Sequence, residues 1–158
     1  MLPNELAKRL GEPVNVEGFK IGPLTKPIGK RLAYTDFTKS STKGYVDIAE
    51  ALPIGSRVTW VLVNVTTAFV GDTTGTLEVG DSSDNDRFCP ATDISVYTAG
   101  VYVLIPDNVA DVGDGDPSIE AATTIRVTIT GTSDWDNVTA GSMDVFVMYE
   151  HIPYEACQ

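Results

Sequence analysis

The sequence predicts an all-β protein, an antiparallel β-sandwich of jelly-roll type with about eight strands and an extended N-terminal arm. Segments rich in β-branched and aromatic residues recur at spacings of eight to twenty residues. Turn-forming residues, drawn from nine prolines and fourteen glycines, separate these segments. No segment between them shows a helical period, and eight strands with long crossing loops favour a jelly roll over an immunoglobulin-like sandwich.

The segment 56–69, SRVTWVLVNVTTAF, is expected to form the central strand. Both of its faces are apolar in the middle, so we expect it to be covered on both sides for part of its length, with Trp60 in the core. Fourteen residues exceed the length of a typical strand, which predicts a bulge near residues 64–67. The turn residues Gly71 and Asp72 then lead into 74–80, the expected second strand of a long hairpin.

The other strands follow from the same reasoning. They are expected at 31–37, 44–52, 101–105, 122–130 and 142–152. The segment 101–105, VYVLI, is apolar on both faces and is therefore predicted to be buried on both sides. Between the strands, 87–95 looks irregular, and Phe88 and Ile94 are expected to fill the core.

Residues 1–30 differ from the rest and are predicted to form an N-terminal arm, which leaves 31–158 as the sandwich body. Asn4 is suited to cap a short helix that reaches Leu10. After it, prolines and glycines break any regular element, and apolar residues occur singly along an extended segment. Such a segment has too little apolar content to fold alone. We expect it to run over a neighbouring subunit.

Charge is distributed unevenly along the chain. Residues 1–43 hold eight Lys and Arg against four acids, a net +4, whereas residues 44–158 hold three against eighteen, a net −15. An acidic body repels phosphates and argues against nucleic acid as a partner. The basic segment is expected to dock on an acidic surface, either of its own body or of another protein. Candidate residues for contact with a partner are Lys8, Arg9, Phe19, Lys20, Ile21, Leu24, Lys26, Ile28, Lys30 and Arg31.

No residue pattern points to catalysis, a metal or a cofactor, so we expect a non-enzymatic protein. His151 is the single histidine and has no nucleophile or acidic partner nearby in sequence. Cys89 and Cys157 form no ligand motif and are expected to be free thiols, which suits folding in a reducing cytoplasm. The sequence contains no apolar run long enough to span a membrane and no signal peptide at its start.

Two acidic segments and one tryptophan leave alternatives open. Residues 81–86 and 107–120 are rich in acids, and we favour solvated loops over a bound calcium ion because their spacing does not match an EF-hand loop. Trp135 stands in a polar segment and is predicted to be the exposed aromatic residue. It would anchor the site if the protein were a carbohydrate-binding module.

The sequence also resembles a known group of proteins. The residues that carry the resemblance are YTDF, GYVDIAEALPIGSRVTWVLVNVTTAFVGDTTGTLEVGD, DRF, TDIS and AGVYVLIP, which together span about residues 31–153. Their order is similar to that in small virion proteins of tailed bacteriophages, in particular head decoration (cement) proteins. The matching features are turns and alternating strands, with no reactive groups among them.

The resemblance implies a jelly-roll-like sandwich that assembles as a homotrimer on the outer capsid surface and clamps neighbouring capsomers. It implies the major capsid protein as a partner, with synthesis in the cytoplasm of the bacterial host. Other expected roles are a tail, neck or head-fibre component of the virion. The arm lies outside the matched residues, so its contact with the capsid is inferred from its composition.

Overall fold

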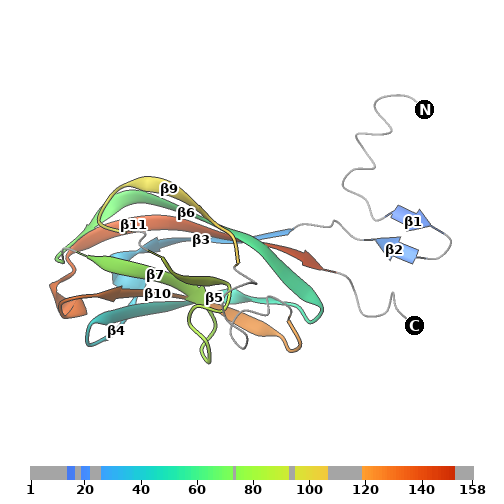
Figure 1. The fold of residues 1–158 in the computed structure, drawn as a ribbon, viewed down its shortest axis with the longest axis horizontal. Helices are drawn as coiled ribbons and strands as arrows, with labels where there is room; N and C mark the ends of the chain where they lie inside the picture. Colours follow the sequence, from blue (N-terminus) through green and yellow to red (C-terminus); the bar gives the residue numbers. More distant parts are fainter. Residues whose placement is uncertain are drawn as a thin grey trace, which may run out of the picture.

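The computed structural model describes residues 14–16, 19–21, 26–72, 74–92, 95–106 and 119–151. Within these residues the chain forms two antiparallel sheets packed face to face, which Figure 1 shows edge-on as two layers. The predicted antiparallel sandwich is confirmed. None of the described helices is long and apolar enough to cross a membrane.

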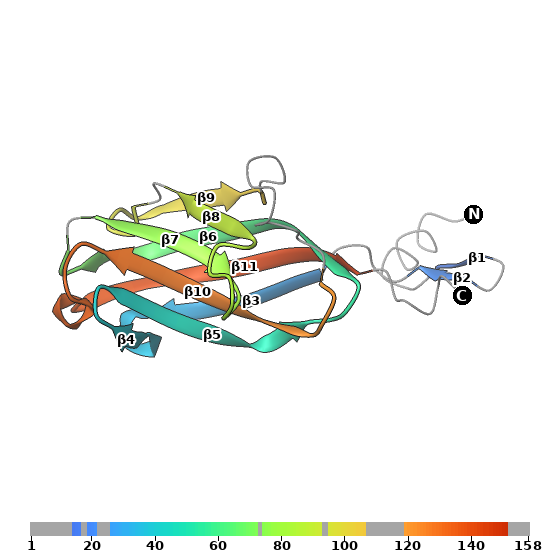
Figure 2. The ribbon, with the colours of Figure 1, turned by 60° about the horizontal axis from the view of Figure 1, so that its bottom comes forward.

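One sheet has four strands and the other has five. The four-stranded sheet has the order β3 (Lys26–Ala33), β11 (Ala140–His151), β6 (Ser56–Val70) and β9 (Gly100–Leu104). The five-stranded sheet, which comes forward in Figure 2, has the order β4 (Thr38–Ser40), β5 (Lys43–Leu52), β10 (Thr123–Gly131), β7 (Gly75–Gly80) and β8 (Cys89–Thr92). The remaining described elements are β1 (Val14–Val16), β2 (Phe19–Ile21) and the 3-10 turns η1 (Tyr34–Asp36) and η2 (Trp135–Asn137).

The connectivity is that of a jelly roll. Apart from the short β1, β2 and β4, the described strands number eight, four in each sheet, and successive strands mostly alternate between the sheets. This corrects the predicted hairpin, because β6 and β7 lie in different sheets and do not pair. Gly71 between them has a φ of +128°, and the Asp72 carboxylate accepts hydrogen bonds from the backbone N–H groups of Thr132 and Ser133. The connection therefore crosses the sandwich.

Strand β6 is central to its sheet, as predicted, and pairs with β11 on one side and β9 on the other. Its register against β11 shifts twice between Val65 and Val70, which confirms the predicted bulge near residues 64–67. The prediction that both faces are covered is wrong. Val61, Val63 and Val65 are buried between the sheets, whereas Trp60 on the opposite face is only half-buried.

The core lies between the two layers and follows the alternation of the strands. From the four-stranded sheet it takes Ile28, Leu32, Val58, Val61, Val63, Val65, Met143, Val145, Val147 and Tyr149, and from the five-stranded sheet Val46, Ile48, Leu52, Leu77, Val79, Ile125, Val127 and Ile129. Burying one such side chain stabilises the fold by about 1.5–3 kcal/mol. Phe88 is fully buried, as predicted, while Ile94 lies outside the described residues.

Trp135 is buried, whereas the sequence predicts that it is exposed. Only 2% of its surface is exposed, and its ring packs 5.2 Å from that of Phe37 and 6.4 Å from that of Phe69. The turn η2 is capped by Asp134, whose carboxylate accepts a hydrogen bond from the Asp136 N–H group. Polar neighbours in sequence thus form a cap whose tryptophan closes one end of the core.

The sandwich begins earlier in the chain than predicted. Residues 26–30, assigned to the arm, are the first part of β3 and pair with β11. Ile28 is 1% exposed and belongs to the core of its own chain, so it is not a free anchor. The predicted strand 31–37 ends at Ala33, where η1 follows. The predicted helix at 4–10 lies outside the described residues.

Candidate functional site

The outer face of the four-stranded sheet carries an apolar surface that no described element covers. The register places outward-facing side chains in rows across the strands. One row runs through Gly29, Phe146, Leu62 and Val103, and a second through Pro27, Met148 and Trp60, with Ile105 following at the end of β9. We call these residues the apolar face. The next row, Arg31, Asp144, Asn64 and Val101, is polar except at its β9 end.

Strand β9 contributes the most exposed apolar side chains of this face. Val101, Val103 and Ile105 are 65%, 61% and 74% exposed. Solvent-facing positions of an antiparallel sheet are ordinarily polar, and contiguous exposed apolar surface marks sites of association. β9 is also an edge strand, and it carries none of the charged residues that commonly protect such edges. The apolar face is therefore the surface best suited to bind a partner.

The apolar face is hollowed between β6 and β9. A depression of about 430 Å³ is lined by Thr59, Trp60, Leu62, Val103 and Ile105. Apolar atoms make up nearly all of its wall. A hollow of this size and chemistry accepts apolar side chains.

Charge on this side of the sheet is neutralised within the chain. The Nε and Nη2 groups of Arg31 donate hydrogen bonds to the carboxylate of Asp144, at 2.7 and 3.1 Å. These hydrogen bonds, with the nearby positive charge, hold the pKa of Asp144 below its ordinary value. The ion pair borders the apolar rows and leaves them without net charge.

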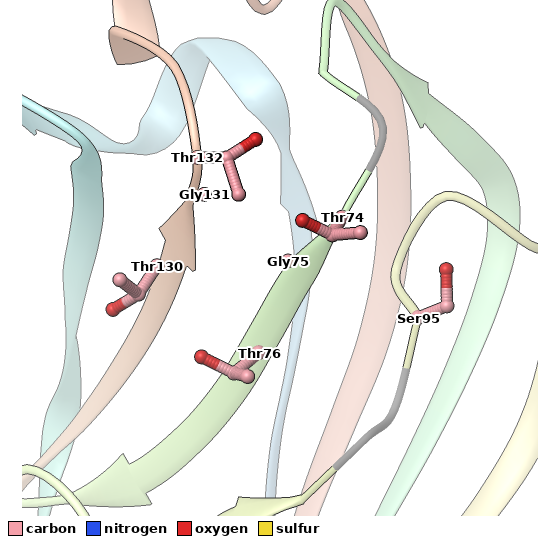
Figure 3. Close-up of a pocket in the computed structure, with 7 residues that line it drawn as sticks. All are labelled: Thr74, Gly75, Thr76, Ser95, Thr130, Gly131 and Thr132. Carbon is pink, nitrogen blue, oxygen red and sulfur yellow. The ribbon is translucent and has the colours of Figure 1, made fainter.

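The outer face of the five-stranded sheet is polar by contrast. Arg126 donates two hydrogen bonds to Asp47 at 2.7 and 2.9 Å and lies over the Tyr45 ring, 4.4 Å from its centroid. Burial raises the pKa of Glu78 on the neighbouring strand. At one end of this sheet a groove of about 380 Å³ is lined by Thr74, Gly75, Thr76, Ser95, Thr130, Gly131 and Thr132 (Figure 3). Its lining residues carry hydroxyl groups and no ionisable side chain.

The acidic segment 81–86 is not a solvated loop throughout. Asp81 is only 6% exposed, and its carboxylate accepts hydrogen bonds from the Ser83 hydroxyl, the backbone N–H groups of Ser83 and Asp84, and Arg87. Among the described residues no group of three or more His, Cys, Asp or Glu side chains could hold a metal ion. Asp81 thus organises a turn, and residues 107–118 of the other acidic segment lie outside the described residues.

The histidine and the described cysteine occupy structural positions. The Nε2 atom of His151 lies 3.1 Å from the carbonyl oxygen of Ile54, to which it donates a hydrogen bond. Cys89 is a free thiol with no exposed surface, and burial raises its pKa to about 12. A thiol in this environment stays protonated and inert. Cys157 lies outside the described residues.

The predicted contact residues fall into three groups. Lys8, Arg9 and Leu24 lie outside the described residues, Phe19, Lys20 and Ile21 form β2, and Lys26, Ile28, Lys30 and Arg31 belong to β3. The structure thus places the last four together on one strand of the sandwich, and the contact role of the ten residues stays a prediction. With the sandwich starting at residue 26, residues 1–25 hold three basic and three acidic side chains and carry no net charge. Much of the basic segment folds back on its own body, where Lys39 pairs with Asp136 at 2.6 Å.

Sequence reasoning missed the apolar face, although its signal was present. Residues 101–105 are apolar on both faces, and this pattern predicts a strand that is buried on both sides. Trp60 was assigned to the core for the same reason. The sequence predicts Trp135 as the exposed aromatic residue. In the structure the aromatic residues of the apolar face are Trp60, which is half-buried, and Phe146, which is 38% exposed and whose ring lies over Gly29.

Comparisons with known proteins identify the fold. No protein-family profile matches the chain, and no curated protein sequence is significantly similar. Among solved structures, a chain of the cyanophage Pam1 capsid asymmetric unit is similar with a TM-score of 0.55 at 20% identity, over 81% of this chain and 85% of that one. A chain of the Ralstonia phage GP4 capsid gives a TM-score of 0.50 at 14% identity, over 80% and 85%. The expected resemblance to bacteriophage virion proteins is confirmed at the level of the fold, which this chain shares with chains of phage capsids.

Proposed function

We propose that this chain is a structural protein of a bacteriophage virion, and more specifically a decoration (cement) protein that binds the outer capsid surface. The apolar face on β6, β9 and β11 carries this proposal, because it leaves an association surface exposed on an otherwise well-packed sandwich. The fold shared with phage capsid chains supports it. On this proposal the protein acts by binding and converts no substrate.

The described architecture suits a clamp. A jelly roll with a continuous core is rigid, so a load at one edge is carried across the sheet without unfolding it. A decoration protein opposes the internal pressure of packaged DNA by adding buried interface across the seams between capsomers. Interfaces of about 1,000 Å² each, repeated over the lattice, are sufficient for stable association. The partners on this proposal are the major capsid protein and further copies of this chain, assembled as a homotrimer.

Copy number in purified particles tests the capsid assignment. Quantitative mass spectrometry of the phage should find this chain in numbers that approach those of the major capsid protein, and a cryo-EM map should show it on the outer surface. A tail, neck or head-fibre component would occur in far fewer copies. Absence from purified particles would overturn the virion assignment.

Sedimentation of the purified protein tests the self-association. We expect a mass of three chains, and a monomer at all accessible concentrations would contradict the homotrimer. A variant that introduces a charge into the apolar face, Val103→Asp, should lose self-association and, with it, binding to capsids that lack the protein. Ala49→Asp, at an exposed position of β5 on the other sheet, is the matched control.

A further inference from the structure

We propose that the hollow between β6 and β9 binds the apolar arm of a second copy of this chain, with Phe19 and Ile21 as the inserted residues. The proposal deepens the self-association in the proposed function and rests on that part alone. It does not depend on where the assembly sits on a virion.

The shape of the apolar face favours an inserted side chain over a flat partner. The hollow lined by Trp60, Leu62, Val103 and Ile105 is a depression in a sheet surface. Its volume of about 430 Å³ lies near the lower end of the range for ligand sites, about 300–1,000 Å³. Such a hollow accommodates one or two large apolar side chains that project from an extended segment, whereas a second sheet face would leave it unfilled.

The arm has the chemistry that this hollow requires. Phe19 and Ile21 alternate with Lys20, so an extended segment can direct both apolar residues to one side. Residues 19–21 already have a strand conformation in β2. An extended segment laid beside β9 can also pair with the open edge of that strand.

The net charge of the arm makes it a better occupant of the hollow than any other part of a second copy. Residues 26–158 hold eight basic and nineteen acidic side chains, a net −11, whereas residues 1–25 carry no net charge. Two sandwich bodies brought together repel each other. The arm is the part of the chain that can approach an acidic body without this cost, and the rows that line the hollow are uncharged.

The arm has the reach to cross to a neighbour. It leaves the sandwich at Lys26, on β3, while the hollow lies beside β9 at the opposite edge of the same sheet. Phe19 lies seven residues before Lys26, so an extended segment carries it at most about 25 Å from the start of β3, more than the distance of about 14 Å across three strand spacings. Figures 1 and 2 both show the β1–β2 hairpin beyond the end of its own sandwich. We therefore assign the hollow to the arm of a neighbouring subunit.

Disulfide trapping between two distinguishable full-length chains tests this. Both chains carry Cys157→Ser, and the buried Cys89 is left in place because its thiol is inert. One chain, with its own affinity tag, carries Phe19→Cys, and the other carries Val103→Cys. Co-expression and mild oxidation should join them into a heterodimer. The control pairs Phe19→Cys with Ala49→Cys, which is exposed on the opposite sheet.

The outcomes separate the possibilities. A docked pair experiences an effective concentration in the mM range against μM for free collision, so on the order of 1,000-fold more heterodimer should form at Val103→Cys than at Ala49→Cys. Equal trapping at the two positions, or none while the protein remains oligomeric, overturns the proposal. A cross-link that forms only within one chain carrying both cysteines overturns it too, because the arm would then cover its own hollow.

The same variants distinguish this inference from the proposed function. Chains that bind capsids but give no heterodimer refute the arm exchange and leave the decoration role intact. Chains that give the heterodimer but never bind capsids refute the decoration role and leave the arm exchange intact.

Discussion

The indole of Trp135 lies against the α-carbon of Gly44, so closely that a methyl group on Gly44 would overlap the ring. Gly44 is buried on β5 and pairs with Ile129 on β10, while Trp135 comes from the turn η2. Phe37 and Phe69 complete the aromatic cluster around the indole. Because Gly44 has no side chain, the indole of Trp135 can pack into the core from a turn whose other residues are polar.

Gly44→Ala tests this contact. Gly44 has an ordinary strand conformation, so the cost of the substitution is steric, and we expect overpacking to lower the free energy of unfolding by about 1–3 kcal/mol. Urea denaturation followed by Trp fluorescence measures it. Gly100→Ala is the matched control, because its new methyl group would meet the Tyr102 side chain, whose hydroxyl oxygen lies nearest at 3.3 Å, and should change stability by a few tenths of a kcal/mol. Equal effects of the two substitutions would contradict the contact.

Truncation tests where the arm ends. A chain of residues 26–158 should retain the circular dichroism and the cooperative unfolding of the full-length protein, because it keeps all of β3. A chain of residues 31–158 should be strongly destabilised or fail to fold, because it loses Ile28 from the core and five of the eight residue pairs between β3 and β11. Removing one buried isoleucine alone costs about 2–5 kcal/mol. Two truncations of equal stability would place residues 26–30 outside the fold.

The pH dependence of stability should reveal Asp81. Burial by itself raises the pKa of this carboxyl, but the hydrogen bonds from Ser83, Asp84 and Arg87 outweigh burial and hold the pKa below the ordinary value of 3.8. A lowered pKa in the folded state contributes stability that is fully present above the unfolded value and is lost as the pH falls through the folded one. Asp81→Asn should therefore cost about 1–3 kcal/mol at neutral pH.

The difference in the free energy of unfolding between wild type and Asp81→Asn should shrink below about pH 4, because the wild-type carboxyl then becomes protonated and loses its charge. Urea titrations at several pH values provide the measurement. A deficit that stays constant down to the lowest pH at which the protein folds would show that the charge of Asp81 contributes nothing.

Polar substitution of the apolar face should separate association from stability. The double variant Val103→Ser and Ile105→Ser changes side chains that are mostly exposed, so the free energy of unfolding should remain within about 0.5 kcal/mol of wild type. Binding of a hydrophobic dye and self-association should both decrease. Val63→Ala, on the buried face of β6, should give the opposite pattern, with a loss of about 2–3 kcal/mol and no change in association. Destabilisation by the double variant would mean that these side chains are covered within the subunit.

The strands themselves were predictable from the sequence, because alternation reports which side chains share a side of a strand. Residues 122–130 and 142–152 were expected as strands and form β10 and β11. The central position of β6 and its bulge followed from its length and apolar content. These features depend on local pattern, and the sandwich follows because such strands must bury one face against another layer.

Only the tertiary structure decided what lies over each face. The sequence could not tell that β6 and β7 enter different sheets, that Trp135 turns inward, or that Val103 and Trp60 remain at the surface. It also placed Ile28 in the arm, because a single apolar residue between Pro27 and Gly29 gives no sign of the strand that pairs with it. The physical reason is that burial belongs to two surfaces brought together by distant segments, whereas periodicity describes one segment alone.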